Sequence, residues 1–128
     1  MISVSVKNQL KFRINSRKIK KSLSTLLEQR GVVSNTRVSV AIVDNKKMLD
    51  ISSKYLKDNK VHNVLTFTDK EVKENFVYPP DDSKHLGEIL VCYPKAKEEA
   101  KHEGISPEEK VIELVEHGAL HLLGIHHD

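Results

Sequence analysis

The stretch from Ser106 to Gly124 constrains the fold most, because it carries both boundaries of one long helix. Ser106 is typical of an N-cap, Pro107 fits the first helical position, and Glu109 completes a capping box. Gly124 can adopt the left-handed conformation that ends a helix. The apolar positions between these bounds predict a mostly buried helix: Val111, Ile112, Leu114, Val115, Leu120 and Leu122.

The remaining sequence predicts strands that alternate with further helices. Strands are expected at 2–6, 36–43 and 86–93, with a strand or an extended segment at 61–67. Helices are expected at 16–31 (capped by Ser16), 45–56 and 94–104. Residues 68–85 are polar and contain Pro79-Pro80-Asp81-Asp82, which indicates a loop. With 128 residues the chain is expected to form one domain, 1–128. The pattern predicts an α+β fold in which a mixed sheet of about four strands is packed by helices on one face.

Composition excludes several classes of protein. No apolar run approaches the roughly 20 residues of a membrane-spanning helix, and the first residues lack the features of a secretory signal. We therefore expect a cytoplasmic protein without a membrane partner. Cys92 is the single cysteine, which excludes a disulfide framework and a cysteine-based zinc site. It is interpreted as a small buried side chain, with a catalytic thiol as the alternative.

The charge balance is compatible with a polyanionic partner but does not require one. The net charge is +3, and basic side chains are densest in the run Arg17-Lys18-Ile19-Lys20-Lys21. A solvated helix face is the preferred interpretation of this run, and contact with nucleic-acid phosphates is the alternative.

Histidine is concentrated near the end of the chain, where His117, His121, Gly124 and His127 form the pattern H-x-x-x-H-x-x-G-x-x-H. Four residues turn a helix by about 400°, so His117 and His121 project from one face. A turn at Gly124 would let His127 return to the same ion. Three neutral imidazoles with an open fourth position are typical of a catalytic zinc site, so one zinc ion is predicted. The alternative is a buried helix with incidental histidines and a histidine-rich tail.

The same spacing occurs in metzincin proteases, whose motif has a glutamate directly after the first histidine. Here that position is Gly118, which has no side chain to take a proton from water. Glu116 lies about 100° around the helix from His117 and cannot simply replace that glutamate. Peptide hydrolysis is therefore disfavoured. A zinc hydrolase such as a peptidase is nevertheless kept as a rival interpretation of the histidine pattern.

The segment from His117 to His127 resembles the motif of the YbeY family of small bacterial metal-dependent endoribonucleases. Asn63-Val64-Leu65-Thr66-Phe67 resembles the VLSF-type strand of that family. Leu86-Gly87-Glu88-Ile89-Leu90-Val91 and the following Pro94-Lys95-Ala96 resemble its GDI strand and P-x-x-A helix start. The resemblance extends over nearly the whole chain.

This resemblance implies a zinc-dependent endoribonuclease of single-strand type, with ligands at His117, His121 and His127. It implies maturation of the 16S rRNA 3′ end and ribosome quality control as the process. The implied partners are rRNA and ribosomal subunits, with assembly proteins also possible and DNA not expected. The alternative is a non-catalytic ribosome-assembly factor whose metal stabilises the C-terminal segment.

Some positions depart from the family pattern. An Asp usually precedes the last His, whereas this chain has His126, so either neighbour can reach the ion and the spacing favours His127. An Arg usually precedes the VLSF-type strand. Counting back from Asn63 places that position at Leu56, with Lys57 beside it as a point donor for phosphate.

Two further side chains are candidate catalytic residues. Glu88 is expected to orient a ligand histidine or act as a general base, with an exposed strand residue as the alternative. His62 stands where the family commonly has Thr. It is expected to act as a base or to contact a phosphate, with a solvated loop histidine as the alternative. His85 and His102 are expected in solvent.

Overall fold

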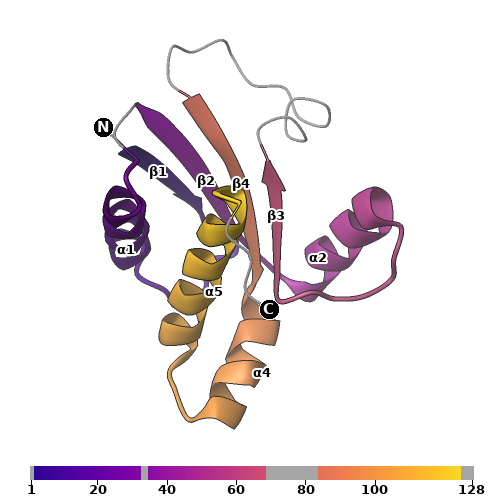
Figure 1. The fold of residues 1–128 in the computed structure, drawn as a ribbon. Coiled ribbons are helices and arrows are strands. Elements are labelled where there is room, and N and C mark those ends of the chain that lie inside the picture. Colours follow the sequence, from indigo (N-terminus) through magenta and orange to yellow (C-terminus); the bar gives the residue numbers. More distant parts are fainter. Residues whose placement is uncertain (1, 33–34, 69–83, 125–128) are drawn as a thin grey trace.

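Four strands form one mixed sheet in the computed structural model, which describes residues 2–32, 35–68 and 84–124 (Figure 1). In chain order the strands are β1 (Ile2–Lys7), β2 (Thr36–Val43), β3 (Val64–Thr68) and β4 (Lys84–Cys92). Their spatial order is β1-β2-β4-β3, with β1, β2 and β4 parallel and β3 antiparallel to β4. The predicted mixed sheet is confirmed, and its central strands are the β-branched run of β2 and the apolar run of β4.

Helices cover both faces of this sheet, although the sequence predicted helices on one face. They are α1 (Ser16–Gln29), α2 (Asn45–Ile51), α4 (Tyr93–Glu103) and α5 (Pro107–Leu122), and a π-helical turn, η1 (Ser52–Leu56), continues α2. The larger core joins α1 and α5 to one face, and a smaller core joins α2 to the other. None of the helices within the described residues is long and apolar enough to cross a bilayer.

The start of α5 follows the predicted capping pattern. The Ser106 Oγ accepts a hydrogen bond from the Glu109 backbone N–H at 3.1 Å, and Pro107 occupies the first turn. Gly124 follows the helix with a φ of 82°, as predicted for a left-handed stop. The bounds of the histidine-bearing helix are thus set by local sequence.

The cap of α1 differs from the prediction, because Asn15 and not Ser16 is the N-cap. The Asn15 Oδ1 accepts hydrogen bonds from the backbone N–H groups of Arg17 at 3.0 Å and Lys18 at 3.4 Å. Asparagine and serine are both favoured at this position, so the two neighbours were equivalent by propensity. The helix itself buries Ile19, Leu23 and Leu27.

The strand β4 begins at Lys84, two residues earlier than predicted, within a segment that is polar in sequence. Residues 84 and 85 were predicted in a loop, but they pair with Thr36 and Arg37 of β2. His85, expected in solvent, is therefore only 6% exposed, and its Nε2 lies 3.4 Å from Ser39 Oγ. His102 is exposed on α4 as expected. The predicted loop around Pro79 lies outside the described residues.

Lys110 ties the first part of α5 to α4. Its side chain is 9% exposed, and its Nζ lies 2.7 Å from Glu103 Oε2 and 3.2 Å from Glu113 Oε1. The hydrogen bond to Glu103 raises the pKa of the Lys110 ammonium; burial opposes this shift, and Glu113 adds to it. This pairing holds α5 at a fixed position on α4.

Candidate metal centre

Two imidazoles stand side by side on α5. His117 and His121 are both exposed, their ring centroids are 5.4 Å apart, and the ring planes meet at 34°. Two imidazoles bound to one tetrahedral zinc ion would have centroids about 5 Å apart, from Zn–N bonds of about 2.0–2.1 Å. The pair therefore has the spacing that a shared metal ion needs.

The third predicted ligand cannot be placed. His127 and its neighbour His126 lie outside the described residues. Within residues 2–32, 35–68 and 84–124 there is no group of three His, Cys, Asp or Glu side chains that could hold a metal ion. The left-handed Gly124 does provide the predicted turn after His121, and its N–H donates to the His121 carbonyl at 2.9 Å.

Gly118 seats the histidine-bearing turn of α5 directly on the sheet. A Cβ at this position would lie 2.9 Å from Ile89 Cγ2 and 3.0 Å from Thr66 Cγ2. Both distances are shorter than ordinary van der Waals contact. A side chain at position 118 would therefore be directed into the sheet. A glutamate there would enter the core and not face an ion at His117 and His121, which strengthens the case against peptide hydrolysis.

Gly87 allows the last turn of α5, which carries Leu122, to approach β4 as closely as the turn at Gly118 does. A Cβ at Gly87 would lie 2.3 Å from the Phe67 carbonyl oxygen and 2.6 Å from Leu122 Cδ2. Sequence reasoning used Gly87 only as part of a resemblance and missed this packing role. A glycine just before a buried strand segment was the one available signal, because such glycines often mark a close backbone approach.

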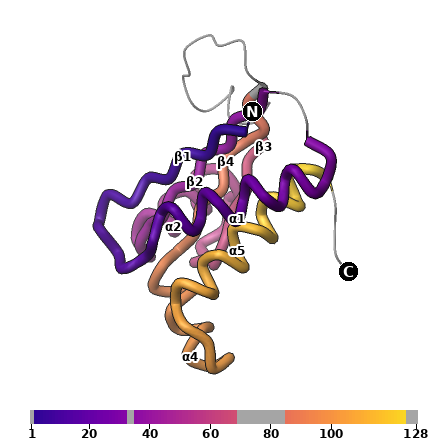
Figure 2. The backbone as a smooth tube through the Cα atoms, turned by 90° about the vertical axis from the view of Figure 1, so that its left-hand side faces the viewer, coloured from indigo at the N-terminus to yellow at the C-terminus, as the bar shows by residue number. Residues whose placement is uncertain are grey.

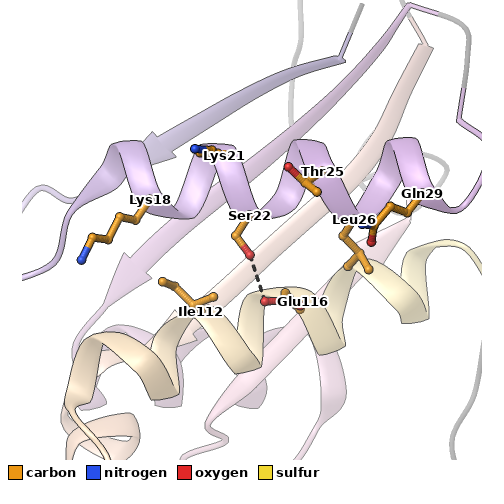
Figure 3. A pocket seen from close by; sticks show the side chains of 8 residues that line it. All are labelled: Lys18, Lys21, Ser22, Thr25, Leu26, Gln29, Ile112 and Glu116. Carbon is orange, nitrogen blue, oxygen red and sulfur yellow. Dashed lines mark hydrogen bonds between the residues drawn. The ribbon is translucent and has the colours of Figure 1, made fainter.

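Glu116 faces α1, away from the histidine pair. Its Oε1 accepts a hydrogen bond from Ser22 Oγ at 2.9 Å (Figure 3). This contact lies in a groove of about 420 Å³ between α1 and α5, lined by Lys18, Lys21, Ser22, Thr25, Leu26, Gln29, Ile112 and Glu116. The carboxylate is therefore engaged on the α1 side, in keeping with its predicted inability to replace the protease glutamate.

Glu88 does not lie beside the histidine pair in the described residues. Gly87 and Ile89 both lie under α5, and side chains alternate between the faces of a strand. Glu88 thus faces the opposite side of the sheet, where it lines a second groove of about 620 Å³ with residues of β2 and α2. This placement does not favour the predicted role of Glu88 in orienting a ligand histidine.

Lys57 and His62 flank a short loop between η1 and β3. Lys57 is exposed and adopts the left-handed conformation, with a φ of 59°. The Nε2 of His62 lies 3.0 Å from Asp58 Oδ2. Desolvation acts to raise the pKa of Asp58, but the hydrogen bond with His62 holds it below its usual value. His62 is thus partnered within its own loop.

This loop lies at the far end of β3 from the end of α5. The Asn63 carbonyl accepts a hydrogen bond from the Cys92 N–H, whereas Leu122 lies against Gly87. Five residues of β4 separate those two points, a length of about 16 Å. Lys57 and His62 can therefore serve the same reaction as His121 only on a substrate long enough to extend along the sheet.

Cys92 is confirmed as a buried side chain. It is fully buried, and its Sγ donates to Asn45 Oδ1 at 3.1 Å. Burial raises the pKa of the thiol, which disfavours the reactive thiolate. We expect the native protein not to react with a thiol reagent such as DTNB at pH 8, and to release one equivalent of thiol after unfolding in guanidinium. Rapid labelling of the native protein would contradict this assignment.

Comparison with known proteins identifies relatives over the whole fold. The family model described as Endoribonuclease YbeY matches residues 3–128. A protein named Endoribonuclease YbeY from Dehalococcoides mccartyi is 29% identical over 98% of this chain and 83% of its own length. One from Macrococcus caseolyticus is 33% identical over 85% of this chain and 70% of its own length. The solution structure of TM1509 from Thermotoga maritima superposes with a TM-score of 0.62 at 23% identity, covering all of this chain and 75% of that one, which shows a shared fold.

Proposed function

The chain belongs to the endoribonuclease YbeY family and is a nuclease acting on RNA, and from this premise we propose that its activity depends on one zinc ion. The proposed ligands are His117, His121 and His127. The observation that carries the proposal is the side-by-side placement of the two exposed imidazoles on α5. When bound, such an ion supplies Lewis acidity toward a phosphodiester.

The residues of the chain suit this chemistry in three ways. The turn at Gly124 supports the return of a third imidazole toward His121. The buried Gly118 provides no carboxylate at the position where proteases have their glutamate, which favours a phosphodiester over a peptide substrate. Lys57 is exposed and positively charged, so it can hold a phosphate of an extended RNA strand.

We further propose rRNA as the substrate, with maturation of the 16S rRNA 3′ end and ribosome quality control in the cytoplasm as the process. Ribosomal subunits are then the particles on which the protein acts. The chain has no tryptophan and only 5% aromatic residues, which disfavours extensive base stacking. Recognition of RNA shape and phosphates is expected instead.

A second candidate function is ribosome assembly without catalysis. One observation favours it: Leu56, at the position where the family usually has Arg, is 44% exposed and cannot bind phosphate. Co-sedimentation with ribosomal subunits, combined with no metal-dependent cleavage of rRNA fragments, would support this candidate over the nuclease.

Metal removal tests the proposal directly. We expect a chelator to stop cleavage of a structured rRNA fragment and stoichiometric zinc to restore it. Metal content of His126→Ala and His127→Ala then identifies the third ligand, with loss expected only for His127→Ala. If His126→Ala loses zinc and His127→Ala retains it, the third ligand is His126. Cleavage that persists without bound metal would contradict the proposal.

A further inference from the structure

Positive charge is concentrated in the segment that forms β1 and α1. Residues 1–32 contain eight Lys or Arg side chains and a single acidic residue, Glu28. Because the net charge of the whole chain is only +3, the rest of the chain is acidic overall. The basic side chains are therefore segregated onto one part of the molecule.

Six of these side chains lie within one segment of 11 residues, 11–21, which runs from the loop after β1 to the second turn of α1. They are all exposed: Lys11, Arg13, Arg17, Lys18, Lys20 and Lys21. We call this set the anchor surface. Among the described residues, Lys18 is the only member with an ion pair, to Glu108 at 3.7 Å, and its side chain is 65% exposed. Within residues 2–32, 35–68 and 84–124, most of the charge of the anchor surface therefore has no acidic partner, which suits it to a polyanion.

The loop that carries Lys11 and Arg13 is held in place by local contacts. The Asn8 side chain accepts a hydrogen bond from the Phe12 N–H at 3.0 Å and donates to the Phe12 carbonyl at 2.9 Å. The Phe12 ring packs on Tyr93 with centroids 4.6 Å apart. Because Phe12 is turned inward, its two basic neighbours are presented outward on a fixed backbone.

The stability of α1 does not explain this charge. The N-terminal end of a helix favours acidic side chains and disfavours basic ones. The first turn of α5 follows this rule with Glu108 and Glu109, whereas the first turn of α1 has no acidic residue and includes Arg17 and Lys18. Arg17 and Lys18 therefore stand at an electrostatically unfavourable end of α1, so helix stability does not account for their charge.

We propose that the anchor surface binds the sugar–phosphate backbone of a structured RNA at a distance from the histidine pair. Figure 2 shows α1 and α5 side by side. The Lys18–Glu108 contact places the start of α1 beside the start of α5. His121 is a further 13 residues along α5, or about 20 Å.

A single nucleotide cannot span this separation, but a folded RNA can. In Figure 3, Lys18 and Lys21 both extend from α1 away from the Ser22–Glu116 contact. The anchor surface thus holds a base-paired part of the RNA, and a neighbouring single-stranded part lies at His117 and His121. Backbone contacts of this kind position a substrate without selecting its sequence. This inference rests on the proposed function, since it names a second contact for the same RNA.

Binding measurements on charge-matched variants test the anchor surface. The first variant is Arg17→Gln/Lys20→Gln/Lys21→Gln, and the control is Lys46→Gln/Lys97→Gln/Lys101→Gln, which removes three exposed charges from α2 and α4. The probe is a fluorescein-labelled RNA hairpin with a single-stranded 3′ tail, followed by anisotropy across a series of KCl concentrations. Melting temperatures no lower than that of the wild type establish that both variants are folded.

We expect the first variant to bind about tenfold or more weakly at low salt, with a salt dependence less steep by about 2 to 3 in log–log slope. The control is expected to stay within about twofold of the wild type. Equal losses in both variants, or no loss in the first, would overturn the anchor surface. Failure of the proposed function is a separate result, in which binding depends on the anchor surface but no metal-dependent cleavage follows.

Discussion

His121→Ala is expected to lose bound zinc and to lose cleavage of rRNA fragments while it remains folded. His121 is exposed, so its removal leaves no cavity in the core. His117 and the proposed third ligand His127 would remain, and two imidazoles hold zinc more weakly than the three of a catalytic site. Loss of a group that only hydrogen-bonds to a metal ligand lowers metal affinity or activity roughly 10- to 100-fold. Loss of the ligand itself is expected to lower metal affinity by more than this.

Two measurements distinguish a role of His121 as a metal ligand from a role in the stability of the fold. Metal content is determined by mass spectrometry after equilibration with zinc, and the melting temperature is compared with and without zinc. Zinc should raise the melting temperature of the wild type, since a ligand that binds only the native state stabilises it. It should leave His121→Ala unchanged. His102→Ala removes an exposed histidine from α4 and is the matched control. One equivalent of zinc retained by His121→Ala would refute the metal centre.

Gly87→Ala is expected to destabilise the protein by at least about 3 kcal/mol, or on the order of 10 °C in melting temperature. The added Cβ would lie 2.3 Å from the Phe67 carbonyl oxygen, which is backbone and cannot rotate away. It would also contact Leu122 at 2.6 Å. To relieve both contacts, β3 and the end of α5 must move away from β4, and His121 moves with α5.

Gly104→Ala is the control for this substitution. Gly104 also has a positive φ, of 73°, but no atom lies within 4 Å of the position of its Cβ. It should therefore lose only the conformational preference of glycine, about 1 kcal/mol. Urea unfolding followed by circular dichroism measures both changes. Similar free energies of unfolding for the two variants would show that the close packing at Gly87 does not add to the cost of the substitution.

Much of the fold was predictable because its boundaries are local. Ser106, Pro107 and Gly124 define α5 from neighbouring residues alone, and the four-residue spacing of His117 and His121 determines their common face. Such features depend on backbone geometry over one or two turns. They need no knowledge of the rest of the molecule, and the structure confirms them.

The features that could not be predicted depend on tertiary contacts. His85 carries a polar side chain in a polar segment, and only its pairing beside Arg37 of β2 reveals that it is buried. Sequence reasoning assigned Gly87 no structural role and identified Gly118 only by its lack of a catalytic carboxylate, whereas both glycines allow α5 to pack closely on the sheet. Glu88 was predicted near the histidines because a carboxylate often orients a zinc-bound imidazole. Strand alternation instead turns Glu88 to the face of the sheet opposite Gly87 and Ile89, which both lie under α5.

The turn after α2 also depends on a distant contact. The helix was expected to continue regularly to Leu56, but its last turn is π-helical. The buried Ser52 Oγ has one proton and lies nearest the Lys60 carbonyl, to which it donates at 2.6 Å, with the Met48 and Leu49 carbonyls farther away at 3.1 and 3.3 Å. This hydrogen bond joins the helix to the loop beyond it. Lys57 then reverses the chain in a left-handed conformation, a position for which lysine has no preference.

The strand order has a consequence for synthesis of the chain. β2 pairs with β1 on one side and with β4 on the other, and β4 ends about 50 residues after β2. At translation rates of about 5–20 residues per second, roughly 2–10 seconds pass before that second partner has been made. During this interval one edge of β2 has unpaired backbone N–H and C=O groups, which readily pair with other chains. The nascent protein is therefore most open to aggregation between synthesis of β2 and synthesis of β4.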